Sequence, residues 1–464
     1  MSSWKEMLAA LAWIALLCTG VGTAAAQAPT PQVSPGRPDV TVPDGDPALY
    51  FNDYSWRSFI ALNWPVVAGA AHRGEADGAK AFGDASGPRV WMTWKSRYEI
   101  FQPGGATPSP WASYGGANPC GEGFANDVVT LRSFRPFGDF NQAGFGLGNM
   151  LNPLVAQNRT YVRYEIRVNE QDFNSIVDNK WYIAGNLPTA ERFVPFNDGS
   201  TTVKAAWRIL TDRDTPAVRA RYYVVKGAQV YDVGSGQCTA HDIALVGLHI
   251  VTKASSRPQW IWSSFEHVDN VPGRTTEPKP PAGVPFSFHD PNRPPMLDPL
   301  RAPPPISPAN PPALDPTPMQ VVRRQAIAPE SMAINEAYWN LPGVKGTVWQ
   351  NYMLVATQWP TAPLPPNPDR MGIPNPGNGF AQSNTTMETY FQSESASCME
   401  CHHESNIAGR DFVMFVTTDA FSPPVPVAPA AGGNHIVGGE PPSPASADPH
   451  VRSLIDLLDA AEKK

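Results

Sequence analysis

The sequence has few charged side chains, no excess of basic residues and no hydrophobic run long enough for a typical membrane span. Asp, Glu, Lys and Arg make up 17% of the 464 residues, and the formal net charge is −7. Such a balance leaves no basic face for nucleic acid or anionic lipid. The longest early apolar stretch, residues 7–21, is about 15 residues long, whereas a helix that crosses a bilayer needs about 20. These absences argue against nucleic-acid binding and against an ordinary transmembrane helix.

The first 26 residues have the pattern of a secretory signal peptide. Lys5 is the only early positive charge, the apolar stretch follows it, and residues 24–26 are three alanines of the kind that signal peptidase requires. We therefore predict cleavage before Gln27 and a periplasmic or secreted protein. If the leader stays uncleaved, the apolar stretch becomes a membrane anchor instead.

Cysteine is scarce, with five residues in the whole chain, and Cys18 lies in the leader. Cys120 and Cys238 have no other obvious partner, and an oxidising compartment favours their pairing. A disulfide that closes so long a loop could stabilise the fold by roughly 4 kcal/mol in the chain-entropy model. The alternative is two separate buried thiols.

The last two cysteines form the most informative motif, a C-x-x-C-H run made by Cys398, Cys401 and His402. This spacing is the attachment signature of c-type haem. Each thiol can add to one vinyl group of the porphyrin, and the histidine that follows then lies under the iron as its proximal ligand. A redox pair does not require His402, and a zinc site needs a second ligand pair that no other cysteines supply. The sequence therefore predicts one covalent haem c per chain.

Proline, with 52 residues, is the most over-represented residue, and it interrupts both helices and central strands. Its clusters divide the chain into predicted regions: a signal peptide at 1–26, a disordered segment at 27–45, a β-rich body at 46–270, a Pro-rich strap or linker at 271–325, a continuation of the body at 326–360, a haem-attachment segment at 380–421, and a Pro/Gly-rich tail with a short helix at 422–464.

Strands dominate the body, and the spacing typical of parallel βαβ units is absent. Strands are predicted at 90–94, 161–168, 203–209, 221–231, 243–253, 259–268 and 347–358. Helices are predicted at 46–63, 169–179, 329–340 and 384–391. The alternation in 161–168 predicts a half-buried strand, with one apolar and one polar face. The fold class is mainly β (α+β): an antiparallel two-layer, sandwich-like body with peripheral helices and a short helical haem segment.

Four side chains are candidates for the sixth ligand of the iron, and the alternative is a vacant sixth position. Met414 and His267 are the possible distal ligands that we favour, although each is also a reasonable core residue of a strand. Met387 precedes the motif closely enough to be a third candidate. His249 lies in the most apolar strand, so we interpret it as a core residue first.

The expected hairpin makes a prediction about the two strand histidines. If Lys253 pairs with Gln259, then His249 and His267 lie on one face of the sheet, about 13 Å apart along the strand. Two residues at that distance could not both bind one metal ion.

Six phrases stand out along the mature chain: Trp56–Pro65 (WRSFIALNWP), Val90–Lys95 (VWMTWK), Leu248–Val251 (LHIV), Trp260–Pro272 (WIWSSFEHVDNVP), Asn351–Pro360 (NYMLVATQWP) and Met387–His402 (METYFQ…SCMECH). They resemble phrases in a poorly characterised group of exported bacterial monohaem proteins of the cytochrome c family. The resemblance implies a single covalent haem on a β-rich body. It carries over only Cys398, Cys401 and His402, and it implies no particular reaction.

Three functions remain open on the sequence. Electron transfer through the haem leads, with an unidentified redox partner protein, no nucleic acid and no membrane contact unless the leader is retained. A haem-dependent oxidase or peroxidase needs a vacant sixth position and a distal acid–base group, for which Glu266 and His267 are the best candidates. A haem-containing binding or sensor module is the third class. Near the motif, Glu400 is expected to face solvent, and His403 to face solvent or a haem propionate.

Overall fold

The computed structural model describes residues 29–38, 47–69, 72–85, 87–114, 120, 130–131, 139–144, 152–232, 236–273, 277–293, 302–360, 383–392 and 396–422. The predicted signal peptide, most of the proline-rich stretch at 360–379 and the predicted C-terminal helix lie outside these residues. Within them, no helix is both long and apolar enough to cross a membrane.

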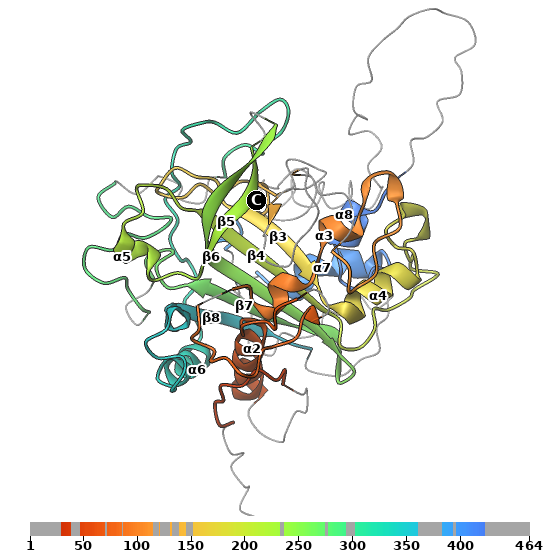
Figure 1. The fold of residues 1–464 in the computed structure, drawn as a ribbon, viewed down its shortest axis with the longest axis horizontal. Helices are drawn as coiled ribbons and strands as arrows, with labels where there is room; N and C mark the ends of the chain where they lie inside the picture. Colours follow the sequence, from red (N-terminus) through yellow and green to blue (C-terminus); the bar gives the residue numbers. More distant parts are fainter. Residues whose placement is uncertain are drawn as a thin grey trace, which may run out of the picture.

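The described strands form one hydrogen-bonded sheet (Figure 1). Its strands are β1 (Lys95–Ser96), β2 (Thr130–Leu131), β3 (Arg163–Val168), β4 (Thr201–Ile209), β5 (Val224–Asp232), β6 (Gln237–Ala254), β7 (Arg257–His267) and β8 (Tyr352–Gln358). All neighbours are antiparallel except β2, which pairs with β5 in parallel. The prediction of a mainly antiparallel, β-rich and sandwich-like body with peripheral helices is confirmed.

The 18-residue strand β6 organises the sheet. One edge of β6 pairs with β4, along the whole length of β4. On the other edge, its first half pairs with β5 and its second half with β7, and β8 then pairs with β7. The sheet therefore divides at β6, and the second half of β6 is enclosed between β4 and β7.

Helices cover both faces of the sheet (Figure 1). On one face, aromatic residues of α2 (Pro47–Leu62) pack against Val203, Ala205 and Phe265 in the largest hydrophobic cluster, which also contains residues of α6 (Pro329–Trp339). The other face carries α3 (Arg97–Ile100), α4 (Glu170–Asp178), α7 (Cys398–Ile407) and α8 (Phe415–Asp419). A short helix, α5 (Pro216–Arg219), precedes β5.

Most predicted elements are present, with shifted ends. The helices at 46–63, 169–179 and 329–340 and the strands at 161–168, 203–209, 221–231, 243–253, 259–268 and 347–358 all have a counterpart. The strand at 243–253 is longer than predicted. The start of the segment at 347–358 is a 3₁₀ helix, η5 (Val348–Asn351), and not a strand.

Three local predictions are wrong. Residues 90–94 form a 3₁₀ helix, η2 (Val90–Thr93), in which the Trp94 amide bonds back to the Trp91 carbonyl. Residues 384–391 form turns and not a helix, since the Tyr390 amide donates to the Ala143 carbonyl and not to the carbonyl four residues before it. Met414 is not in a strand; it precedes α8.

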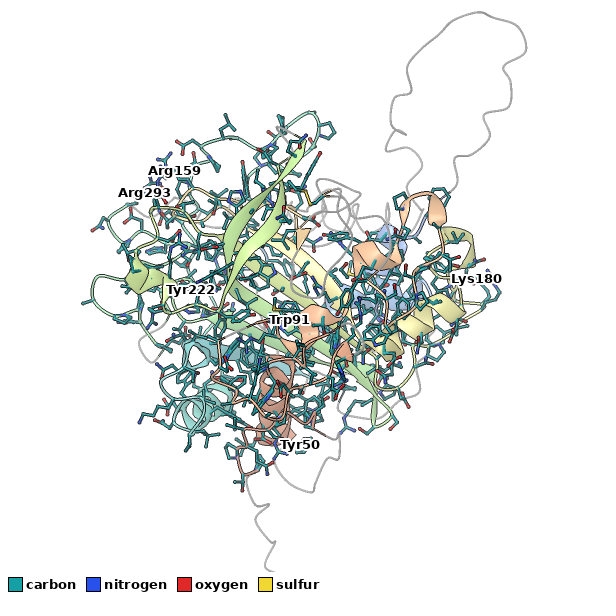
Figure 2. All side chains as sticks on the ribbon, viewed as in Figure 1. Tyr50, Trp91, Arg159, Lys180, Tyr222 and Arg293 are labelled. Carbon is teal, nitrogen blue, oxygen red and sulfur yellow. A yellow bond between two sulfur atoms is a disulfide. The ribbon has the colours of Figure 1, made fainter. Side chains whose placement is uncertain are left out.

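The polar face of β3 is buried and not exposed as the alternation predicted. Glu165 accepts hydrogen bonds from the Trp207 indole at 2.8 Å and from Arg167 at 2.8 Å. Both charged residues are therefore buried as a hydrogen-bonded pair, which is the condition under which charge is tolerated inside a protein. In Figure 2, the label of Trp91 lies near the centre of the molecule and that of Lys180 at its edge.

Segments predicted to be irregular pack on the body. In the stretch 271–325, Phe288, Met319 and Val321 are buried in a hydrophobic cluster with strand residues, so the described part of this stretch is a strap and not a free linker. Residues 29–38, predicted to be disordered, also contact the body, where Arg37 donates a hydrogen bond to the Thr201 hydroxyl.

The predicted disulfide between Cys120 and Cys238 is confirmed. Cys238 lies near the start of β6, so the bond ties Cys120 to the long central strand. The sequence separation is 118 residues, and a loop of that length falls in the range where a crosslink constrains the unfolded chain most strongly.

Candidate haem-attachment site

One cavity opens on the sheet face that α7 covers. Its floor comes from side chains that share this face through register pairing: Ile166 with Lys204, Lys204 with His249, Thr202 with Val251, and Val251 with Trp262. Its other walls come from α7, the segment 412–418 and the turn at 387–391. The open volume is about 1450 Å³ including its solvent-filled mouth.

All three side chains of the C-x-x-C-H motif line this cavity, at the start of α7. The Ser397 hydroxyl caps the helix by accepting the Glu400 amide hydrogen, and the Gln358 carboxamide at the end of β8 accepts the Met399 amide hydrogen at 2.7 Å. The first turn of α7 is thereby anchored to the sheet. Cys398 and Cys401 are free thiols.

The thiols have the properties of attachment residues more than of a redox pair. Burial raises the pKa of Cys398, and it raises the pKa of Cys401 to about 12. Catalytic C-x-x-C pairs work in the opposite direction, because they lower the pKa of the reactive thiol.

The His402 ring is held in one orientation and one tautomer. Its Nδ1 lies 2.8 Å from the carbonyl oxygen of Phe412. A carbonyl only accepts, so Nδ1 carries the hydrogen and the lone pair of the neutral ring is on Nε2. Burial lowers the pKa of His402 to about 4, and the ring packs against Trp262 with centroids 4.5 Å apart. A hydrogen bond from one ring nitrogen to a carbonyl, which leaves the other nitrogen free, is typical of a metal-ligating histidine.

A strained turn positions that carbonyl. Asp411 and Phe412 both have left-handed backbone angles, with φ of 47° and 66°, and Trp260 beside them has φ of 70°. Asp411 accepts a 2.7 Å hydrogen bond from Lys253 through its carboxylate, and its carbonyl accepts the Trp260 indole hydrogen at 2.9 Å. Residues outside glycine occupy this region only where surrounding contacts enforce it, and such positions concentrate at functional sites.

The few charged groups that line the cavity come from segments other than α7. Lys204 supplies positive charge, and burial lowers its pKa to about 8, whereas Arg97 is paired with Asp139 at 2.5 Å and with Asp419 at 3.6 Å. Glu388 supplies the carboxylate, and burial raises its pKa to about 7. The rest of the lining is largely apolar and includes Trp262 and Phe412. An apolar cavity with a basic group in its wall suits a flat hydrophobic macrocycle that carries carboxylates.

The structure separates the candidate ligands of the iron. Met387, Met414 and His249 all line the cavity. His267 does not: its Nε2 lies 3.1 Å from the Arg221 carbonyl, and its Nδ1 accepts the Asp269 amide hydrogen at 3.1 Å. Both ring nitrogens have structural partners, which removes His267 as a distal ligand.

The predicted hairpin register is also wrong by one residue. His249 pairs with Ser264, not Ser263, and the turn consists of residues 255–256. Opposite partners share a face and the side-chain period is two, so His249 and His267 lie on opposite faces of the sheet and not on one. His249, which we had interpreted first as a core residue, lies in the cavity.

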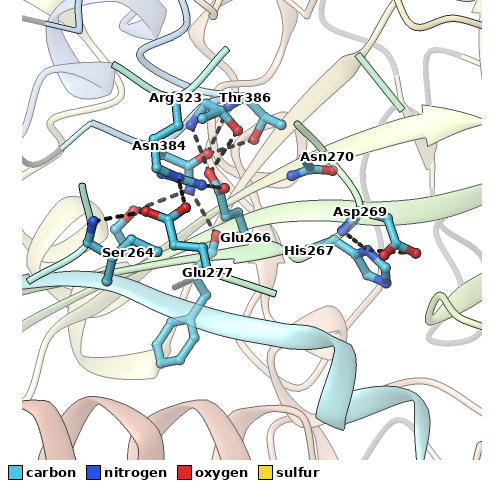
Figure 3. Close-up of polar contacts among 12 residues, drawn as sticks. Ser264, Glu266, His267, Asp269, Asn270, Glu277, Arg323, Asn384 and Thr386 are labelled. Carbon is cyan, nitrogen blue, oxygen red and sulfur yellow. Dashed lines mark hydrogen bonds and ion pairs between the residues drawn. The ribbon is translucent and has the colours of Figure 1, made fainter. Parts of the chain in front are cut away.

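Glu266, the proposed acid–base residue, is part of a buried anchor and not of the cavity (Figure 3). One carboxylate oxygen pairs with Arg323, which also contacts Glu277 at 2.9 Å. The other accepts from the Thr385 amide and hydroxyl at 2.8 and 2.9 Å. This network joins β7 to the strap and to the turn before the haem motif.

Near the motif, Glu400 is exposed, as expected, and His403 is half-buried. Within the described residues, no group of three or more His, Cys, Asp and Glu side chains could hold a bare metal ion. Comparison with family models, with curated proteins and with solved structures finds no match for this chain. The functional argument therefore depends on the residues of the site itself.

Proposed function

We propose that the chain is an exported monohaem c-type cytochrome that transfers electrons through a haem held by Cys398, Cys401 and His402. The observation that carries the proposal is the shared cavity: two free thiols line it, and the adjacent imidazole is fixed by the Phe412 carbonyl with its Nε2 lone pair available. The Cys120–Cys238 disulfide supports an oxidising compartment.

The residues of the site fit the group. The thiols of Cys398 and Cys401 would each form a thioether, and His402 Nε2 would be the proximal ligand. Lys204 would be the basic partner for a propionate. When bound, haem supplies a one-electron iron couple whose potential depends on the axial ligands and on burial. The tryptophans and phenylalanines of the cavity exclude water, and the Phe412 carbonyl increases the basicity of His402.

The test is covalent haem on the full-length chain, produced in a bacterial host competent in c-type cytochrome maturation. Intact mass of the denatured, solvent-extracted protein should show one added haem. The double variant Cys398→Ser/Cys401→Ser should show none, whereas Glu400→Gln, an exposed position inside the same motif, should keep it. A wild-type chain without added mass would overturn the proposal.

A second candidate, a haem-dependent oxidase or peroxidase, is favoured by one observation. Glu388 Oε2 lies 3.6 Å from His249 Nε2 in the cavity, a pair that could act as a distal acid and base. Voltammetry and peroxide consumption separate the two functions. Electron transfer predicts reversible one-electron reduction without peroxide turnover.

A further inference from the structure

His249 projects from the middle of β6 into the cavity that contains His402. Its neighbour on the same strand face, Val251, pairs with Trp262, and the His402 ring packs against Trp262. Residues two apart on a strand lie about 7 Å apart. The two imidazoles therefore occupy one region of the cavity, with His402 on the wall made by α7 and His249 on the wall made by the sheet.

Among the residues that the structure describes, the buried Nε2 atom of His249 has no hydrogen-bond partner. The nearest charged group, Glu388 Oε2, is 3.6 Å away, beyond hydrogen-bond distance. Buried polar atoms nearly always have a partner, so an unsatisfied one needs an explanation.

The two methionines of the cavity are less suited to the opposite side. Met414 lies two residues after Phe412, whose carbonyl accepts the hydrogen bond from His402. Met414 therefore comes from the same segment that positions the proximal ligand. Met387 is 1% exposed and packs in a hydrophobic cluster with Tyr164 and Val246. Its position is accounted for by core packing.

We propose that His249 is the second axial ligand, so that the iron is held between two imidazoles, from α7 and from β6. The inference depends on the haem attachment proposed above and deepens it. Imidazole in place of methionine lowers the reduction potential, since Met ligation raises it. The consequence is a low-potential electron carrier with no vacant coordination position, whose partner would be a low-potential donor or acceptor protein.

The experiment compares spectra of the matured full-length protein. Wild type should be low-spin in both oxidation states, with the near-infrared magnetic circular dichroism of two imidazole ligands and slow CO binding. His249→Ala should keep its covalent haem by intact mass, become largely high-spin and bind CO rapidly, and added imidazole should restore the low-spin spectrum. His249→Met should shift the near-infrared band to that of Met ligation and raise the potential. Met414→Leu and Met387→Leu are the matched controls from the same cavity, and both should keep the wild-type spectrum.

Three results would overturn the inference while leaving the haem attachment intact. One is a high-spin wild type, which would favour His249 as a distal acid–base group. Another is a low-spin spectrum unchanged in His249→Ala. The third is a sulfur–iron band in wild type that disappears in Met414→Leu or Met387→Leu. Absence of covalent haem from wild type is a different outcome, because it would overturn the proposed function itself.

Discussion

Replacing Glu266 by Gln tests whether this residue anchors the fold or performs acid–base chemistry. The substitution keeps the size of the side chain and removes its charge. The carboxylate serves Arg323 with one oxygen and Thr385 with the other, and Glu266 and Arg323 are 0% and 6% exposed. Glutamine retains one accepting oxygen, so it can accept from either Arg323 or Thr385 but not from both. It presents an N–H group to the donors of the other residue.

The expected cost follows from these contacts. A hydrogen bond to a charged group contributes about 1.5–3 kcal/mol, and a buried donor left without a partner costs a further 1–3 kcal/mol or so. Complete loss of a partner from a buried ion pair costs about 3–5 kcal/mol, but Glu277 stays beside Arg323 at 2.9 Å and moderates the loss. We expect Glu266→Gln to lower the free energy of unfolding by about 3 kcal/mol.

Urea unfolding of the matured protein measures this loss as a lower midpoint at unchanged slope. Glu336→Gln, at an exposed carboxylate of α6, is the control and should change stability by less than about 0.5 kcal/mol. A double-mutant cycle with Arg323→Met should give a coupling energy within about 0.5–3 kcal/mol. Wild-type stability in Glu266→Gln, combined with lost turnover of peroxide, would refute the anchoring role.

Two further predictions concern stability. Burial raises the pKa of Asp172 to about 7, so the folded chain keeps a proton that the unfolded chain releases near pH 4. The free energy of unfolding should therefore fall by up to about 4 kcal/mol as the pH rises from 4 to 7. Asp172→Asn should abolish this decline in urea titrations at several pH values; an unchanged pH slope would assign it to another group. Cys120→Ser/Cys238→Ser should lower the free energy of unfolding by about 4 kcal/mol. Alkylation of wild type without reductant should label neither Cys120 nor Cys238, and two labelled thiols would contradict the pairing.

Local pattern predicted much of the fold. Continuous apolar character predicted the central strand, because this signal acts within a few residues. The short aromatic run at 90–94 was misassigned since five residues do not establish a period, and its backbone bonds are satisfied within itself. Buried charge on β3 was missed because Glu165 depends on Trp207, which is distant in the sequence.

The candidate site was only partly predictable. The C-x-x-C-H spacing is a local covalent requirement, so Cys398, Cys401 and His402 could be identified directly. The choice of His267 over His249 failed because strand register determines which face a side chain occupies, and one residue of slip reverses it. Lys204 and Glu388 gave no local signal, since they meet only across β4 and the turn before the motif.

The sequence by itself determined an antiparallel β-rich body, a disulfide and a thiol–thiol–imidazole motif, because these follow from periodicity, scarcity and spacing. The tertiary structure alone decided that Glu266 is an anchor, that the Phe412 carbonyl orients His402 and that His249 enters the cavity. Each of these depends on segments more than a few residues apart, whose positions follow from sheet register and burial and not from local composition.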